Sequence, residues 1–387
     1  MKVGQVTFCG DNFGSVLQCY ATQKVLQQKG IETVLLQRKE RGIGRVVQSL
    51  EFRACAGYKY LRYPKYRDIF AETLKISRGT TVDEGLDAEA SICISGFISE
   101  NIRLRPCSWK QLKQLGKSKE YTAFFSGSDQ IWNGKWFITN RLWFLRFAPK
   151  NKRVAWMPSL GGQEVYPYNI RTYKKYISDY CFLSARESEG SRVISQLTGR
   201  ETPVLADPVL LLDENVWRQT AASVQTDKKY ILMFFLDRPS DLALETAEQL
   251  KAATGCSVIY FSYKYENLGG GEQDFLSGGP AEFISMIDKA SFVLTDSFHA
   301  CLFSIVLTTP FFAFSRSSSI GASQVSRVKN LLERFGMEDR LVAEKNGICD
   351  SDFFMDAEKI KAIIQQERKS AEDYLERVLS YYSEGAQ

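Results

Sequence analysis

The sequence predicts an α/β fold built from two Rossmann-like domains that face each other across a cleft. Short apolar runs rich in β-branched and aromatic residues alternate with stretches of helical periodicity, which is typical of parallel sheets covered by helices. This pattern starts a second time beyond residues 207–228. The chain length of 387 residues also fits two domains of about 150 residues or more each.

The first half opens with a βαβ unit. A strand is predicted over residues 3–8, after which apolar residues recur at helical spacing until Gly30, and a second strand covers residues 31–36. The further apolar runs predict four more strands, at residues 123–125, 153–157, 181–184 and 204–206.

The second half repeats the alternation of strands and helices. The predicted strands are 230–236, 257–261, 292–295 and 311–314, and the predicted helices are 241–253 and 298–307. We therefore expect a first domain over residues 1–207 and a second over residues 208–345. A polar helical pattern over residues 356–382 predicts that the segment 346–387 is helical and either packs back on the first domain or stays free.

The composition restricts the chemistry. With 44% hydrophobic and 25% charged residues the chain is globular, and its single histidine, His299, excludes any centre that needs two imidazoles. No metal site and no redox cofactor are expected. The nine cysteines are scattered without a CxxC pair, which favours reduced thiols in the cytoplasm. The most apolar stretch, residues 301–314, is too short to span a bilayer, so we expect a soluble protein.

Positive charge is concentrated in residues 38–67. This segment has nine Lys and Arg against two acidic residues, a surplus of seven in a chain whose net charge is only +5. Tyrosines alternate with the basic residues, a combination that suits anionic headgroups or diphosphates at a membrane surface. A solvated basic face is the simpler interpretation. Nucleic acid is not an expected partner, because no nucleic-acid-binding motif accompanies the charge.

Two segments of the first half follow predicted strands and hold candidate ligand-binding residues. Residues 10–15 include Asp11 and Asn12 at a strand-to-helix turn, where free N–H groups favour an anion, although a turn without a ligand fits equally well. Residues 126–133 lie at the carboxyl end of a strand, where parallel sheets bind ligands. They indicate either a sugar-binding loop or a helix cap with Trp132 in the core.

Two further segments supply a cation and a titratable group. Arg186 follows an apolar strand and could bind a carboxylate or phosphate, or could instead pair with Glu187. His299 lies in the first turn of a predicted helix after Asp296 and Ser297. There the helix dipole disfavours the imidazolium and a nearby anion favours it, so the pKa can be tuned as a general acid requires; a purely structural histidine is the alternative.

Taken together, these segments resemble one family. The blocks GDNFGSVLQCYA, FFSGSDQIWN, VAWMPSLGG, LSARESEG, VLADPVLLL, TDSFHACLFSIVLTTPFFAF and VSRVKNLLERFGMEDRLV resemble, in this order, the polysaccharide pyruvyl transferase family. The resemblance implies a GT-B-like two-domain fold. It also implies transfer of an enolpyruvyl group from phosphoenolpyruvate to two sugar hydroxyls as a cyclic ketal, with release of phosphate, in the synthesis of a bacterial surface polysaccharide such as a capsule or exopolysaccharide.

The resemblance also implies roles for individual residues. His299 would be the catalytic proton donor. The donor-binding residues would be Arg186, Arg327, Arg316 and Ser297, where Ser297 stands two residues before the histidine at a position that is often arginine in the family. The acceptor-binding residues would be Asp11, Asn12, Ser128, Asp129, Gln130 and Trp132.

The implied acceptor is a saccharide, expected on a polyprenyl diphosphate carrier, and the segment 38–67 would touch the inner face of the membrane. Two alternatives share the expected architecture. One is a GT-B glycosyltransferase that uses a nucleotide sugar, and the other is a non-catalytic glycan-binding relative, which the serine at position 297 motivates.

Overall fold

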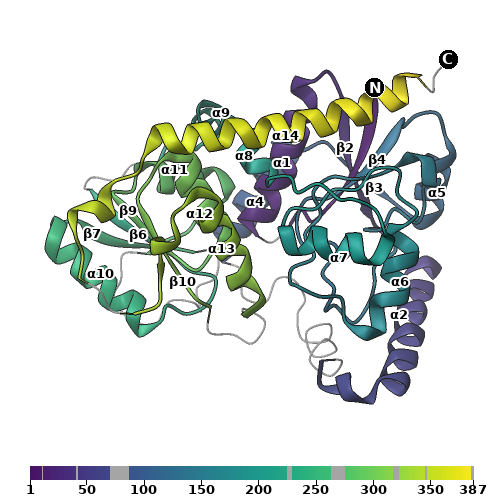
Figure 1. Cartoon of the computed structure of the whole chain (residues 1–387), viewed down its shortest axis with the longest axis horizontal. Helices are drawn as coiled ribbons and strands as arrows, with labels where there is room; N and C mark the ends of the chain where they lie inside the picture. Colours follow the sequence, from purple (N-terminus) through teal and green to yellow (C-terminus); the bar gives the residue numbers. More distant parts are fainter. Residues whose placement is uncertain are drawn as a thin grey trace.

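The computed structural model describes residues 1–10, 12–40, 42–69, 87–224, 229–262, 275–316, 322–344 and 347–384. Within them the chain forms two parallel sheets, each flanked by helices (Figure 1). Five of the eleven strands in these ranges are buried along their whole length, as expected of parallel strands that are covered on both faces. The predicted α/β architecture with two parallel sheets is therefore confirmed.

The first sheet has the order β3-β2-β1-β4-β5. Its strands are β1 (Lys2–Val6), β2 (Glu32–Arg38), β3 (Leu104–Cys107), β4 (Ala123–Ser126) and β5 (Arg153–Ala155). The strands predicted at 181–184 and 204–206 are wrong as strands: these segments form only single bridges, between Val154 and Phe182 and between Ala185 and Val204. Extension of the second bridge toward residue 183 would need an N–H from Pro203, which proline lacks.

The second sheet has the order β11-β10-β9-β6-β7-β8. Its strands are β6 (Tyr230–Phe234), β7 (Ser257–Phe261), β8 (Phe275–Leu276), β9 (Phe292–Thr295), β10 (Phe311–Phe314) and β11 (Leu341–Val342). The strand β6 is central and pairs with β7 and β9. The carboxyl ends of β6 and β9 therefore adjoin, and the helix that carries His299 starts directly beyond β9.

Helices connect the strands and cover the sheets. Those of the first half are α1 (Phe13–Gln28), α2 (Ile43–Arg62), α4 (Ala88–Asn101), α5 (Trp109–Lys117), α6 (Pro167–Ile177) and α7 (Ser188–Thr198). The short α8 (Pro208–Leu211) and α9 (Glu214–Thr220) lead to the second sheet, which α10 (Asp241–Thr254), α11 (Pro280–Lys289), α12 (Phe298–Leu307) and α13 (Ala322–Phe335) flank. The left-handed Gly255 ends α10, where the sequence predicts a stop.

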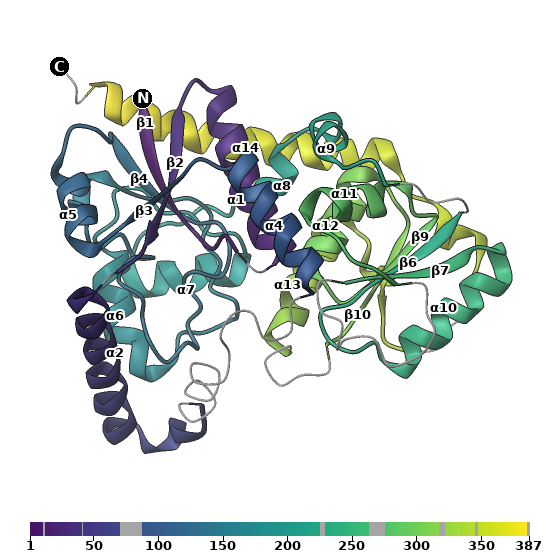
Figure 2. The same cartoon turned by 180° about the vertical axis from the view of Figure 1, so that it is seen from behind.

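Helix α1 lies between the two halves of the molecule and is buried on nearly every side (Figure 2). Its first residue, Phe13, inserts among aromatic rings of the second half, with centroids 5.9 Å from Phe234, 5.8 Å from Phe261 and 5.4 Å from Phe283. One hydrophobic core cluster thus runs from α1 through α8 into α11 and α12. The two halves share apolar packing, which restricts how α1 can move relative to α12.

The long C-terminal helix α14 (Ala357–Glu384) spans both halves along one edge of the molecule (Figure 1). Its buried Tyr374 packs near Trp156 and donates a hydrogen bond of 2.7 Å to the carbonyl of Ala155 at the end of β5. Arg368 donates to the carbonyls of Leu210 and Leu212 beside α8. The C-terminal helical segment therefore packs on the first sheet and on the connection between the halves.

Helix α2 projects from the first domain on the side remote from α14 (Figures 1 and 2). Its inner side is fixed by Lys59, which is buried and donates hydrogen bonds to Phe137 O at 2.7 Å and Asn169 Oδ1 at 2.6 Å. Burial lowers the pKa of Lys59 to about 8. Lys59 therefore does not belong to the exposed basic face predicted for residues 38–67. None of the helices in the described ranges is long and apolar enough to cross a membrane.

Replacing Phe13 by alanine should test the shared core. Because a large cavity would open among three aromatic rings, we expect Phe13→Ala to lower the free energy of unfolding by about 3–5 kcal/mol. Chemical denaturation followed by circular dichroism measures the change. Ile92→Ala on α4 removes an apolar side chain that is 72% exposed and should have little effect. Equal effects of the two substitutions would contradict the packing of Phe13 described above.

Candidate active site

The only histidine of the chain lies where the two halves meet. His299 is the second residue of α12, and its ring lies against Gly14 in the first turn of α1: a Cβ built on Gly14 would stand 2.1 Å from His299 Nδ1. Glycine is therefore required here by close approach. Ser297, predicted in the donor site, is buried and caps α12, its Oγ accepting a hydrogen bond from Ala300 N at 3.4 Å.

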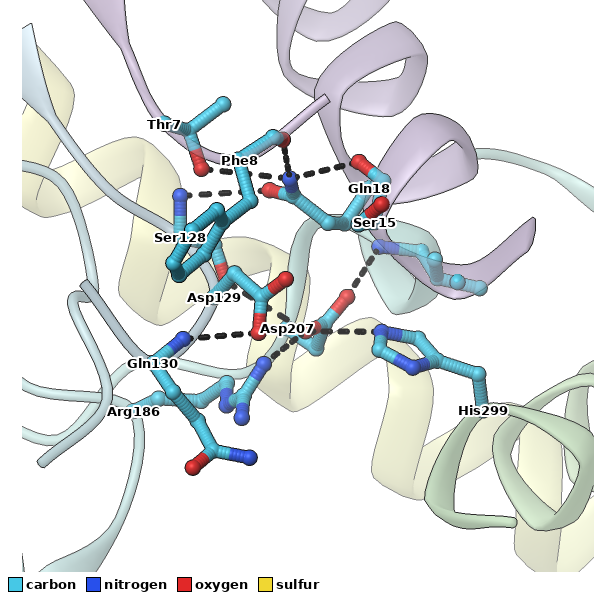
Figure 3. Close-up of polar contacts among 12 residues, drawn as sticks. Thr7, Phe8, Ser15, Gln18, Ser128, Asp129, Gln130, Arg186, Asp207 and His299 are labelled. Carbon is cyan, nitrogen blue, oxygen red and sulfur yellow. Dashed lines mark hydrogen bonds and ion pairs between the residues drawn. The ribbon is translucent and has the colours of Figure 1, made fainter. Parts of the chain in front are cut away.

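A buried carboxylate, Asp207, lies at the centre of the site (Figure 3). Its Oδ2 accepts a hydrogen bond of 2.7 Å from Arg186 Nη1 and one of 3.3 Å from Ser128 Oγ, and it lies 3.9 Å from His299 Nε2. Its Oδ1 caps α8 by accepting from Val209 N at 3.0 Å. Asp207 thus connects the loop after β4, the segment around Arg186 and the start of α12.

Two guanidinium groups flank the ring of Phe298, the residue before the histidine. The Arg186 Cζ is 4.9 Å and the Arg327 Cζ 5.2 Å from the ring centroid. Arg186 also donates to Glu187 Oε1 at 2.9 Å, so the ion pair that the sequence offered as an alternative is formed. Although burial lowers the pKa of Arg186, the charges of Glu187 and Asp207 raise it above its ordinary value.

Arg327, on α13, is buried close to the charge of Arg186. Burial, followed by repulsion from Arg186, lowers the pKa of Arg327 to about 10. An anion placed near both arginines would reverse this destabilisation, because it would be attracted by each of them. The two arginines are therefore the candidate residues for contact with an anion, beside the carboxylates of Asp207 and Glu187 that already pair with Arg186.

The imidazole of His299 is neutral in this environment. Burial lowers its pKa to about 4, an effect that Asp207 and Asp129 partly oppose and that Arg186 and Arg327 reinforce. The protonated form would become stable only when further negative charge enters the site. Burial is thus the main cause of the low pKa of His299, and its role as a general acid stays a prediction.

Two buried polar atoms beside Asp207 have no hydrogen-bond partner among the described residues: Arg186 Nη2 and His299 Nε2. Figure 3 shows the two side chains reaching Asp207 from opposite sides. Leaving such atoms unsatisfied costs about 1–3 kcal/mol each, which a bound ligand would recover. The two unsatisfied atoms therefore mark this position as a candidate ligand site.

The loop after β4 divides into a part at the site and a part in the core. Ser128 contacts Asp207, and the charge of Asp129 acts on His299. Trp132 is fully buried, stacked on Phe144 at 5.4 Å, so its ring has no surface on which an acceptor could bind. Its predicted direct contact with the acceptor is corrected accordingly: Trp132 holds the loop from inside.

The other predicted residues have local structural roles. Asn12 caps α1 by accepting from Gly14 N at 2.8 Å, and Gln130 Oε1 accepts from Asn133 Nδ2 at 2.9 Å. Asp11 lies outside the described residues. Arg316 forms an ion pair with Asp237 and lies 3.8 Å from Asp296, beyond the ends of β6 and β9.

Two residues at the site were missed by the sequence reasoning. Asp207 stands directly before Pro208 at the start of a helix. A polar or charged residue at the start of a helix is also the signal that singles out Asp129 and Arg186. Gln18 is a fully buried amide on α1 that donates to Phe8 O at 2.9 Å and accepts from Ser128 N at 3.2 Å. A polar residue within the apolar pattern of α1 was the available signal for it.

The contact between α1 and the imidazole can be tested without an assay of activity. Gly14→Ala should displace the ring, because its Cβ would overlap His299 Nδ1. The single histidine gives one set of imidazole NMR signals, and these should shift. Gly10→Ala in the same loop, where a Cβ would meet nothing within 4 Å, is the matched control. Unshifted signals in Gly14→Ala would contradict the placement of His299.

The charge environment of His299 can be tested by titration of the same signals. Without a ligand the ring should stay neutral between about pH 5.5 and 8, in contrast to an ordinary histidine. Arg327→Gln removes a positive charge and should raise the pKa of His299, whereas Asp207→Asn removes a negative charge and should lower it. Shifts in the same direction for both variants would contradict this electrostatic account.

Comparison with solved structures supports the fold. Staphylococcus aureus MnaA in complex with UDP has 11% sequence identity and a TM-score of 0.50, with 99% of this chain and 97% of that chain covered. The predicted GT-B-like fold is thereby confirmed. UDP-GlcNAc 2-epimerase from Neisseria meningitidis has 12% identity, coverage of 95% and 100%, and a TM-score of 0.43. The calicheamicin glycosyltransferase CalG4 has 10% identity, coverage of 99% and 98%, and a TM-score of 0.45.

Comparison with protein families is decisive at the level of sequence. No curated protein sequence gives a significant match. The model of the family described as polysaccharide pyruvyl transferase, however, matches residues 12–318, which include the loop after β4, Arg186, Asp207 and His299. The match covers well over half of the 387 residues. The chain belongs to the polysaccharide pyruvyl transferase family.

Proposed function

We propose that this protein transfers the enolpyruvyl group of phosphoenolpyruvate to two hydroxyls of a saccharide, forming a cyclic ketal and releasing phosphate. The observation that carries the proposal is the pair of buried atoms, Arg186 Nη2 and His299 Nε2, that lie beside Asp207 without partners among the described residues. Membership in the family supports the reaction class. Phosphoenolpyruvate supplies both the charge and the hydrogen-bond acceptors that these atoms require.

The donor would bind at the junction of the two halves. Arg186 and Arg327 together would hold its carboxylate and phosphate, since a guanidinium binds either group through paired hydrogen bonds. The aromatic ring of Phe298 lies against both guanidinium groups and orients them. Ser297 caps α12 and carries no charge, whereas the family often has an arginine at this position. Arg186 and Arg327 would therefore bind the charges of the donor without a third arginine.

His299 would act as the general acid. Its imidazolium gives a proton to the methylene carbon of the donor, which leaves an oxocarbenium-like centre at the carbon bearing the phosphate. One sugar hydroxyl attacks that carbon, the bond to phosphate breaks, and the second hydroxyl closes the ketal. The two hydroxyls release two protons. One returns to His299, which regains its charged form, and the other leaves with phosphate.

The protonation of His299 would be coupled to binding. The ring is neutral in the free protein because burial lowers its pKa to about 4, so it must take up a proton as the donor enters. The charge of the donor offsets the repulsion by Arg186 and Arg327, and Asp207, at 3.9 Å from Nε2, stabilises the imidazolium. The acid thus becomes active only when its substrate is present.

The acceptor would approach from the first domain, where Asp129 and Gln130 follow β4. We propose a saccharide on a polyprenyl diphosphate carrier, an intermediate of surface-polysaccharide synthesis such as that of a capsule or exopolysaccharide. The enzyme would then work in the cytoplasm at the inner face of the membrane, where such a carrier presents its headgroup.

The reaction can be tested by mass spectrometry of a lipid-linked saccharide incubated with phosphoenolpyruvate and the enzyme. We expect a pyruvyl ketal adduct and one phosphate released per adduct. His299→Gln, which keeps the size of the side chain, should lower turnover by about 10²–10⁴-fold, the usual contribution of a general acid. Arg192→Gln, at an exposed position on α7, is the control and should retain full turnover.

Two results would overturn the proposal. An unchanged rate in His299→Gln would remove this residue from the mechanism. Absence of an adduct with a broad panel of saccharides, together with thermal stabilisation by nucleoside diphosphates but not by phosphoenolpyruvate, would instead indicate a glycosyltransferase.

A further inference from the structure

The outer side of α2 carries an apolar stripe that is exposed to solvent. It consists of Val46, Val47, Leu50 and Leu61, which are 59%, 47%, 58% and 75% exposed. At 3.6 residues per turn, Val46, Leu50 and Leu61 lie on one face of the helix, with Ala54 exposed between them. Scattered exposed apolar residues are common, but a continuous stripe on a helix indicates an interaction surface.

The stripe lies opposite the side by which α2 is attached. Ala56 and Lys59 are buried, and Lys59 is held by Phe137 and Asn169 of the first domain. Residues 56 and 59 are about half a turn away from the stripe at helical spacing. Helix α2 also projects from the molecule on the side remote from α14 (Figure 1), and among the described residues its stripe is exposed.

Positive charge surrounds the stripe. The exposed basic residues of this region are Arg45, Arg53, Arg62, Lys65 and Arg67, against the exposed acids Glu51 and Asp68. Tyr58 and Tyr60, 65% and 37% exposed, border the stripe as well. An apolar face flanked by arginines and tyrosines is the pattern of a helix that lies in the interface of a lipid bilayer.

We propose that α2 docks on an anionic bilayer, with the stripe inserted at the level of the headgroups and the arginines beside lipid phosphates. The charge selects this occupant: a second copy of the chain would bring one positive surface against another, whereas an anionic bilayer complements it. This inference deepens the proposed function, because it places the enzyme where a lipid-linked acceptor is presented. Binding to lipid itself requires neither donor nor acceptor.

Vesicle sedimentation tests the docking with the full-length protein and no substrate. We expect binding to phosphatidylcholine vesicles that contain about one third phosphatidylglycerol, weaker binding to phosphatidylcholine alone, and weakening by salt. The combined Val46→Gln, Leu50→Gln and Leu61→Gln variant should bind about a hundredfold more weakly, since three apolar anchors are lost. Arg53→Gln with Arg62→Gln should weaken binding about 25-fold, because each charge contributes roughly fivefold.

Matched controls separate docking from general effects of substitution. Ile92→Gln on α4 and Arg192→Gln on α7 alter exposed residues outside α2 and should leave binding unchanged. Absence of binding by the wild-type protein, or equal binding by the stripe variant, would overturn the proposal. A wild-type dimer that the stripe variant converts to a monomer in analytical ultracentrifugation would assign the stripe to a second copy instead.

The proposed reaction can fail independently of the docking. If docking is right and the reaction is wrong, the protein binds anionic vesicles but forms no adduct. If both are right, the stripe variant should lose turnover with acceptor embedded in vesicles, and should keep it with the same saccharide on a short, water-soluble carrier. Loss of turnover with both acceptors would show that α2 serves the active site rather than the membrane.

Discussion

The site depends on the hydrogen bonds that the buried carboxylate of Asp207 accepts. Its oxygens hold Arg186, the hydroxyl of Ser128 and the start of α8, and one of them faces His299. A buried charge of this kind is stable only if paired and hydrogen-bonded, so its partners are held in turn. The position of the arginine relative to the imidazole, which decides the electrostatics of the site, is therefore set by one side chain.

The geometry also depends on apolar packing between the halves. The imidazole comes from the second sheet, and Gly14, against which it lies, comes from the first helix. Phe13, the neighbour of Gly14, inserts among three aromatic rings of the second half, and this contact fixes the start of α1 relative to α12. A site assembled from both halves thus needs a shared core, and α1, buried on nearly all sides, provides it.

The proposed active site and the proposed membrane-binding surface need opposite environments. The chemistry that we propose lies at the buried junction, where burial lowers the pKa values of His299 and Arg327. Contact with a large amphipathic partner needs the opposite, an exposed apolar face with charged borders, and α2 offers this on the outside of the first domain. One structure can therefore meet a water-soluble donor and, as we propose, a lipid-bound acceptor.

The sequence by itself determined the fold class, because strand and helix periodicities are local and the strands are short, mostly apolar runs; α12 was predicted with its observed bounds. It also determined the family and singled out His299 and Arg186. Only the tertiary structure decided that Asp207 joins them, that Trp132 is in the core and that Lys59 is buried beneath α2. These outcomes depend on which side chains meet across segments 21 to 110 residues apart, or on which face turns inward. The spacing of residues along the chain shows neither which side chains meet nor which face is buried. The same residue types form helix caps, ion pairs and ligand contacts.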